Sequence, residues 1–241
     1  MEDIPTRVAQ IRERIVAAAR RAGRRPEEIT LVAVSKTHGP DVVRAALAAG
    51  ITDLGENRVQ EAAPKIATLA NSHPRPRWHL IGHLQRNKAR AAAELFDIVQ
   101  SVDSLRLAEI LDRHAAEIGR RLPILLQVNV SGEVSKEGFA LAGGIANRAA
   151  CDLLYAEVER IVALPQLEVR GLMTIAPITG DPDAARPTFR LLRELRDDLA
   201  RRLPQTRWDD LSMGMSDDFE AAIAEGATIV RVGRAIFGSR M

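Results

Sequence analysis

The sequence predicts an α/β protein that closes into a (β/α)8 barrel, a TIM barrel, with one extra helix at its N-terminus. Three observations favour this fold. Short apolar or β-branched runs alternate with longer segments that carry apolar residues every three or four positions. Eight strand–helix units of this kind fit into the 241 residues. No proline-, serine- or glycine-rich linker divides the chain, so residues 1–241 are expected to form a single domain.

The elements follow one another in the order that a barrel requires. The amphipathic segment Met1–Arg25 predicts a helix that packs on the barrel from outside. Strands are expected at Thr30–Ser35, Asp53–Gly55, His79–Gly82, Ile98–Val102, Ile124–Val130, Glu168–Ile175, Asp210–Met213 and Ile229–Val232. Helices are expected at Asp41–Ala49, Arg58–Leu69, Leu84–Leu95, Ser104–Ile118, Gly143–Ala163, Ala184–Leu203 and Asp217–Ala224, with a loop at Thr179–Pro187. Periodicity does not show whether a sheet closes, so an open, doubly wound sheet remains the alternative.

The composition excludes several classes of protein. The 34 basic and 32 acidic residues leave a net charge of +2, which is too balanced for a nucleic-acid-binding surface. The single cysteine, Cys151, excludes an intramolecular disulfide and a cysteine zinc cluster, and it suits the cytoplasm. No apolar run approaches the roughly 20 residues that span a bilayer. No metal is expected either, because neither a carboxylate nor a third histidine accompanies His79 and His83 in their segment.

Lys36 is the first candidate for chemistry, because it directly follows the apolar run that ends in Ser35. An apolar surrounding disfavours the ammonium form of a lysine, and the free amine attacks an aldehyde to form an imine. Taken alone, however, Lys36 is better explained as a strand-end lysine whose ammonium group reaches solvent than as a reactive amine.

Two loops near the C-terminus change that balance. The loops after strands seven and eight of such barrels commonly bind phosphate. After the seventh strand, Gly214 permits close backbone approach, and Ser216 is expected to cap the next helix. After the eighth, Gly233 and the amide of Arg234 are placed to face the same anion. Barrel closure would bring both loops beside Lys36, which fits an aldehyde that carries a phosphate, such as pyridoxal 5′-phosphate (PLP).

Two further residues are candidates for contacts with the cofactor ring. Arg231 precedes Gly233 by two positions, and a guanidinium stays protonated, so it cannot lend a proton to the pyridine nitrogen. The ring would then be a weak electron sink. Asn57 follows the second strand and is expected to hydrogen-bond the ring edge, with capping of the next helix as the alternative.

These motifs resemble those of the pyridoxal phosphate homeostasis proteins, single-barrel relatives of the N-terminal domain of alanine racemase. The resemblance covers nearly the whole chain and rests on Val34–Thr37, Gly55–Glu61, Trp78–Lys88, Gln127–Asn129 with Ser135–Phe139, Arg170–Pro177, Leu211–Asp218 and Val230–Gly238. It implies that Lys36 is the Schiff-base lysine and that Arg231 faces the pyridine nitrogen. It also implies that Ser216, Gly233 and Arg234 bind the phosphate and that Asn57 and Met215 line the pocket.

The chain also departs from its relatives. The helical stretch Gly143–Ala163 is longer than the family usually has and holds the only tyrosine, Tyr155. A two-base racemase takes a second acid/base, a tyrosine, from a C-terminal β-domain of its partner subunit. We expect no such domain here, and therefore a monomer.

The sequence therefore favours a PLP carrier or buffer without a dedicated reaction, which makes transient contact with PLP-dependent apoenzymes. The alternative is a low-activity PLP enzyme resembling an amino-acid racemase. The sequence shows no candidate for an opposing general base, which favours the carrier. Lys136 is a candidate for a second, transient PLP attachment point, although a solvated loop lysine is the stronger explanation.

Overall fold

Parallel strands close into a barrel in the computed structural model, which describes residues 3–133, 136–177 and 181–238. β1 pairs with β2 on one side and with β9 on the other, and β4 pairs with β5, so eight of the described strands form a ring. The strands of the ring are β1 (Thr30–Val34), β2 (Asp53–Glu56), β3 (Arg77–Leu80), β4 (Ile98–Val102), β5 (Leu122–Asn129), β7 (Leu167–Met173), β8 (Asp210–Ser212) and β9 (Ile229–Val232). The predicted barrel is confirmed, and the open sheet is wrong.

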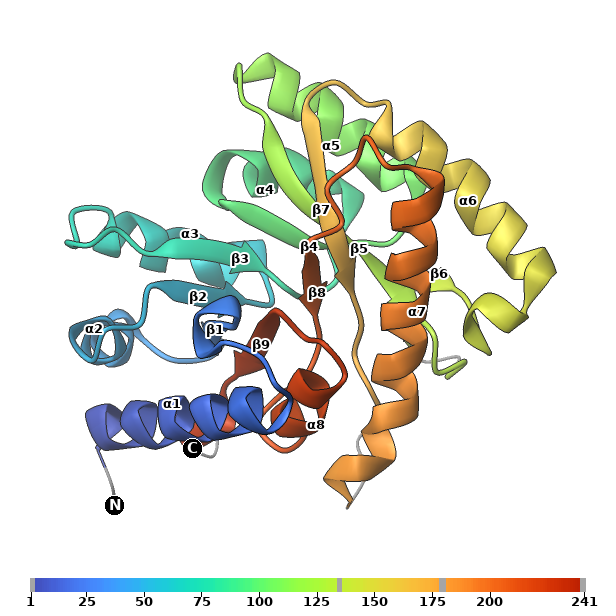
Figure 1. Cartoon of the computed structure of the whole chain (residues 1–241). Helices are drawn as coiled ribbons and strands as arrows, with labels where there is room; N and C mark the ends of the chain where they lie inside the picture. The colour runs from blue at the N-terminus through green and yellow to red at the C-terminus, as the bar shows by residue number, and fades with distance from the viewer. Residues whose placement is uncertain (1–2, 134–135, 178–180, 239–241) are drawn as a thin grey trace.

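Helices surround the barrel (Figure 1). Helix α1 lies outside it and packs on α2, α8 and α9, as expected for the N-terminal segment. The helices are α1 (Ile4–Arg21), α2 (Pro40–Ala48), α3 (Val59–Leu69), α4 (Ala89–Leu95), α5 (Leu105–Glu117), α6 (Arg148–Val162), α7 (Arg186–Arg202), α8 (Phe219–Ala224) and α9 (Arg234–Phe237). Short 3-10 helices occupy Pro26–Glu28, Arg86–Lys88, Gly144–Ala146 and Pro182–Ala185.

Several predicted boundaries need correction. The stretch Gly143–Ala163 is not one helix, because Asn147 separates the 3-10 turn from α6 and accepts a hydrogen bond from the Ala150 amide. Likewise, Leu84–Leu95 contains a 3-10 turn before α4. The sequence missed β6 (Phe139–Ala140), which pairs with the end of β5. In the expected loop Thr179–Pro187, residues 179–180 lie outside the described residues, while the rest forms a 3-10 turn and the start of α7.

The apolar core is divided by the barrel wall. The larger cluster includes Trp78, Phe96 and Phe189 and fills the space between strands and helices. A smaller cluster of Val32, Leu125, Met173 and Ile229 comes from four strands and fills part of the barrel interior. No helix among the described residues is both long and apolar enough to cross a membrane.

Barrel closure places the ends of β1 and β9 side by side. Val32 pairs with Arg231 and Ala33 with Val232, so Gly233 lies next to Val34. A Cβ atom on Gly233 would come within 3.3 Å of the Val34 carbonyl oxygen. The loop after β9 therefore lies beside the segment that carries Lys36.

Candidate functional site

A cavity of about 790 Å³ opens among the carboxyl ends of the strands. All seven site residues expected from the sequence line it, namely Lys36, Asn57, Met215, Ser216, Arg231, Gly233 and Arg234. They follow or end β1, β2, β8 and β9, whose neighbours in the closed sheet bring them together. In such barrels, this face carries the functional sites.

The segment around Lys36 is held from inside the protein. Lys65 of α3 donates hydrogen bonds from Nζ to the Ser35 carbonyl oxygen at 2.8 Å and to Glu56 Oε1 at 2.7 Å. The next residue after Lys36, Thr37, has φ of 68°, a left-handed conformation that turns the chain sharply. The position from which Lys36 enters the cavity is therefore fixed by buried contacts.

His38 forms the wall of the cavity next to Lys36, a position that sequence reasoning missed. Its ring stacks on Phe237 with 5.0 Å between the ring centres. Burial and the nearby charge of Lys65 both lower the pKa of His38. Both effects favour the neutral form of the ring.

Asn57 reaches the cavity because its backbone lies against a glycine. A Cβ on Gly82 would lie only 2.4 Å from the Asn57 carbonyl oxygen, so no larger residue fits there without a shift. The capping alternative for Asn57 is wrong, since Arg58 is the N-cap of α3 and no side chain accepts its first amides.

The loop between β8 and α8 differs from the sequence expectation. Ser216 does not cap α8, which begins at Phe219; its Oγ atom instead accepts a hydrogen bond from the Ala235 amide at 3.3 Å. Asp218 turns the loop by accepting a hydrogen bond from the Met215 amide at 2.6 Å. Ser216 thus joins the loops after β8 and β9 at the cavity wall.

Arg231 and Arg234 have different surroundings. Arg231 is buried and donates to Ser212 Oγ at 2.6 Å and to the Thr174 carbonyl oxygen at 2.8 Å. Burial lowers the pKa of its guanidinium to about 10, so the charge persists at pH 7. Arg234 is exposed, and its side chain pairs with Asp217. The backbone amide of Arg234 is therefore the group suited to an anion in the cavity.

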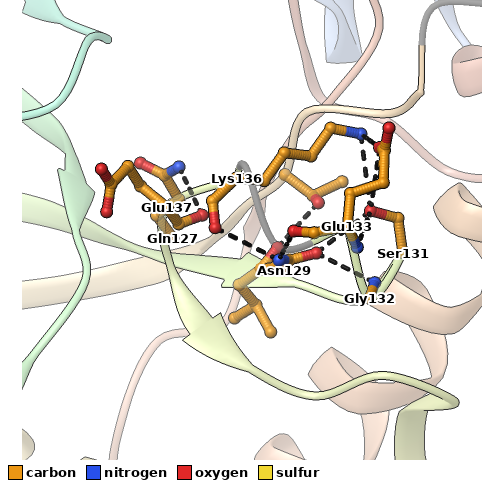
Figure 2. A network of polar contacts seen from close by, with 9 residues as sticks. Gln127, Asn129, Ser131, Gly132, Glu133, Lys136 and Glu137 are labelled. Carbon is orange, nitrogen blue, oxygen red and sulfur yellow. Dashed lines mark hydrogen bonds and ion pairs between the residues drawn. The ribbon is translucent and has the colours of Figure 1, made fainter.

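The loop after β5 brings Lys136 and Glu137 to the cavity. Figure 2 shows the polar contacts within this loop. Asn129 donates to the carbonyl oxygens of Glu133 at 2.8 Å and Lys136 at 3.2 Å, and its Oδ1 atom accepts from the Gly132 amide. Lys136 Nζ forms an ion pair with Glu133. Lys136 is thus held within its loop rather than fully solvated. Ser135 of the same motif lies outside the described residues.

The two histidines considered for a metal do not share a site. His79 is buried between Asp53 and Gln100, inside the barrel. His83 is half-exposed, with Nδ1 3.2 Å from Asp103 Oδ2 and 3.9 Å from Glu137 Oε2. The carboxylates near His83 thus come from segments distant in the sequence.

Tyr155 lies away from the cavity, on α6. Its hydroxyl donates to Asp198 Oδ2 of α7 at 2.5 Å, and the guanidinium of Arg202 lies over its ring. Burial and this carboxylate raise the pKa of Tyr155. The Tyr155 side chain thus connects α6 to α7.

Comparison with known proteins places the chain among its relatives. The family model described as the N-terminal domain of alanine racemase matches residues 7–241. The pyridoxal phosphate homeostasis protein of Pseudomonas aeruginosa is 46% identical over 240 residues, covering 100% of this chain and 97% of that protein. The chain belongs to the pyridoxal phosphate homeostasis protein family. The member of this family from Escherichia coli is 44% identical, over 100% of this chain and 98% of its own length.

Solved structures agree with this family and its fold. PipY of Synechococcus elongatus, solved with PLP bound, is 41% identical, with a TM-score of 0.83 over 98% of this chain and 100% of that chain. An alanine racemase of Clostridium difficile has a TM-score of 0.66 at 13% identity, over 95% of this chain and 59% of that chain. The second likeness concerns the barrel fold alone.

Proposed function

We propose that this chain binds PLP as a Schiff base on Lys36 and carries or buffers it without a dedicated reaction. The observation that carries the proposal is that Lys36, Ser216 and Gly233 line the same cavity. Pairing of β1 with β9 places the segment of Lys36 beside the loop of Gly233. The related PipY, which has PLP bound in a solved structure, supports the same cofactor.

Each part of PLP has a suitable group in the cavity. The unprotonated Nζ of Lys36 adds to the aldehyde carbon, and the C=N bond forms with loss of one water molecule. The hydroxyl of Ser216 and the backbone at Gly233 and Arg234 suit the phosphate. Arg231 suits the pyridine nitrogen as a fixed hydrogen-bond donor, and Asn57 and Met215 suit the remaining edge of the ring.

The positions of two side chains, Arg231 and Tyr155, favour a carrier over a racemase. Arg231 keeps its proton at pH 7, so PLP held there supplies little electron withdrawal. Tyr155, the only tyrosine, is bound to Asp198 outside the cavity. His38 and His83 do line the cavity, however, and they are the specific reason to test the alternative of a weak amino-acid racemase.

The test combines absorbance with proton exchange. Wild type titrated with PLP should gain the absorbance band of an imine, and Lys36→Ala should not. Exchange of the α-proton with deuterated solvent, measured by NMR over a panel of amino acids, should stay near the rate of free PLP. Rapid exchange that depends on Lys36 would replace the carrier with the racemase-like enzyme, and no imine band in wild type would contradict both functions.

We also propose that the chain acts as a monomer in the cytoplasm and passes PLP to apoenzymes through transient contact. Among the described residues, Ile118 and Leu153 are the exposed large apolar side chains, and two isolated residues do not form a subunit interface. Light scattering checks the mass. Mixing the loaded chain with a PLP-dependent apoenzyme should restore its activity faster than dissociation of PLP into solution allows.

A further inference from the structure

A row of buried polar side chains crosses the inside of the barrel. The row comprises Arg231 on β9, Ser212 on β8, Gln100 on β4, His79 on β3 and Asp53 on β2, each at most 4% exposed. It begins at the cofactor cavity, which Arg231 lines. It ends at Asp53, the first residue of its strand and thus at the opposite end of the barrel.

The row is continuous in hydrogen bonds. Arg231 Nη1 donates to Ser212 Oγ at 2.6 Å, and Ser212 Oγ donates to Gln100 Oε1 at 2.6 Å. Gln100 Nε2 lies 2.8 Å from His79 Nδ1, and His79 Nε2 lies 2.9 Å from Asp53 Oδ1. Four bonds therefore connect a buried cation to a buried carboxylate.

The two ends and the orientation of the Gln100 amide together fix the direction of every bond. A guanidinium has donors only, and a carboxylate has acceptors only. Ser212 accepts from Arg231 and donates to Gln100 Oε1, and the amide nitrogen of Gln100 donates to His79 Nδ1. His79 is left with its single proton on Nε2, facing Asp53. All donors point from the cavity toward Asp53, so reversing one bond would break its neighbours.

The charges at the ends explain why the row exists. Arg231 takes part in none of the ion pairs among the described residues. Asp218 interacts electrostatically with the Arg231 guanidinium but does not form a hydrogen bond with it. A buried cation without a contacting anion is costly, and a polarised chain of dipoles that ends on a carboxylate lowers this cost. Asp53 is anchored in turn by Thr52 Oγ1 at 2.7 Å and Arg77 at 2.8 Å.

We propose that Ser212, Gln100, His79 and Asp53 are positioning residues, which hold the Arg231 guanidinium in the orientation that meets the PLP ring. Two of the five N–H groups of the Arg231 guanidinium donate to Ser212 Oγ and to the Thr174 carbonyl oxygen. Because the guanidinium is planar and rigid, these two bonds set the direction of its remaining N–H groups. The influence on the cofactor rests on the proposed function, whereas the direction of the row is a property of the protein alone.

The chain offers a matched control for the test. Ser101 is as buried as Ser212, lies next to Gln100 on β4, and its hydroxyl has no hydrogen-bond partner among the described residues. Ser212→Ala removes a bridging hydroxyl, whereas Ser101→Ala removes one outside the row. Asp53→Asn is the second variant, because it removes the terminal charge and keeps an acceptor for His79.

Two measurements decide the proposal. In the unloaded wild type at pH 7, the ring ¹⁵N shifts of His79 should show a proton on Nε2 and none on Nδ1. Titration with PLP should show about fivefold weaker binding and a displaced imine absorbance maximum in Ser212→Ala and Asp53→Asn. Ser101→Ala should match wild type in both.

The outcomes separate this proposal from the proposed function. A charged His79, or one protonated on Nδ1, would overturn the row. So would equal effects of Ser212→Ala and Ser101→Ala, or no change of binding and absorbance in Asp53→Asn if Ser212→Ala fails to fold. Absence of an imine band in wild type would instead contradict the proposed binding of PLP as a Schiff base. The ¹⁵N shifts of His79 would still test the direction of the hydrogen bonds in the row.

Discussion

Lys65 Nζ lies 2.8 Å from the carbonyl oxygen of Ser35, the residue that immediately precedes Lys36. Lys65 belongs to α3, and both it and its second partner, Glu56, are buried. A lysine that forms no part of the cavity lining thus fixes the backbone from which the cofactor-binding lysine extends. The stability of this segment depends on a buried ion pair.

Lys65→Met should destabilise the protein by about 3–5 kcal/mol, because it leaves the Glu56 carboxylate buried without its cation. Urea unfolding at pH 7 measures the change. Arg58→Gln is the control, since it breaks the exposed pair of Arg58 and Glu61 and should cost at most about 1 kcal/mol. A Lys65→Met protein as stable as the control would show that the buried pair contributes no more than the exposed one.

Gly82→Ala should weaken PLP binding and destabilise the fold by about 1–3 kcal/mol, because the new Cβ displaces the Asn57 backbone from the cavity wall. Gly39→Ala is the matched control: nothing lies within 4 Å of its added Cβ, and its backbone suits alanine. As Gly39 is an N-cap, we expect a loss of at most about 1 kcal/mol there. Unfolding curves and PLP titrations that coincide for both variants would refute this role of Gly82.

Ser216→Ala should weaken PLP binding about 10- to 100-fold and leave binding of pyridoxal, which lacks the phosphate, within about twofold. The reason is the loss of a hydroxyl that joins the two loops of the proposed phosphate site. Absorbance titrations with the two aldehydes check the ratio. An equal loss for both would place the phosphate elsewhere.

The acid stability of the protein should depend on Asp198. Burial raises its pKa, but hydrogen bonds from Tyr155, Arg202 and Arg201 prevail and lower the pKa to about 2. A carboxyl with a lowered folded-state pKa stabilises the fold fully above its ordinary pKa of 3.8, and this contribution is lost as the pH falls toward 2.

Wild type and Asp198→Asn should therefore differ by a constant free energy of unfolding between pH 5 and pH 7, and the difference should narrow below about pH 4. Tyr155→Phe should show a smaller effect of the same sign, because it removes one of the hydrogen bonds that lower this pKa. Urea midpoints across the pH range give both curves. A difference that grows as the pH falls would contradict the sign.

The sequence predicted the parts of the site that depend on strand order. Lys36, Ser216 and Gly233 follow strands whose neighbours are set by barrel closure, so periodicity and loop chemistry were sufficient to bring them together. The detailed role of Ser216 was wrong, because Asp218 accepts the Met215 amide and delays the start of α8. Alternative local hydrogen bonds of this kind are not visible in residue types alone.

Contacts across the barrel were not predictable in the same way. Gln100 and Ser212 are 112 residues apart, and their hydrogen bond exists because both side chains point into the same interior. The signal in the sequence is the occurrence of Gln100 and Arg231 within largely apolar strands. Such residues indicate an internal polar network, but only the closed barrel shows which partners they meet.

The most direct test of a Schiff base on Lys36 is reduction of the PLP-loaded protein with borohydride, followed by peptide mass spectrometry. We expect the reduced pyridoxyl phosphate on the peptide that contains Lys36, and no label at that peptide in Lys36→Ala. Lys88→Ala, a control outside the cavity lining, should be labelled like wild type. Labelling of wild type chiefly at Lys88 or Lys136, with Lys36 unmodified, would contradict the account.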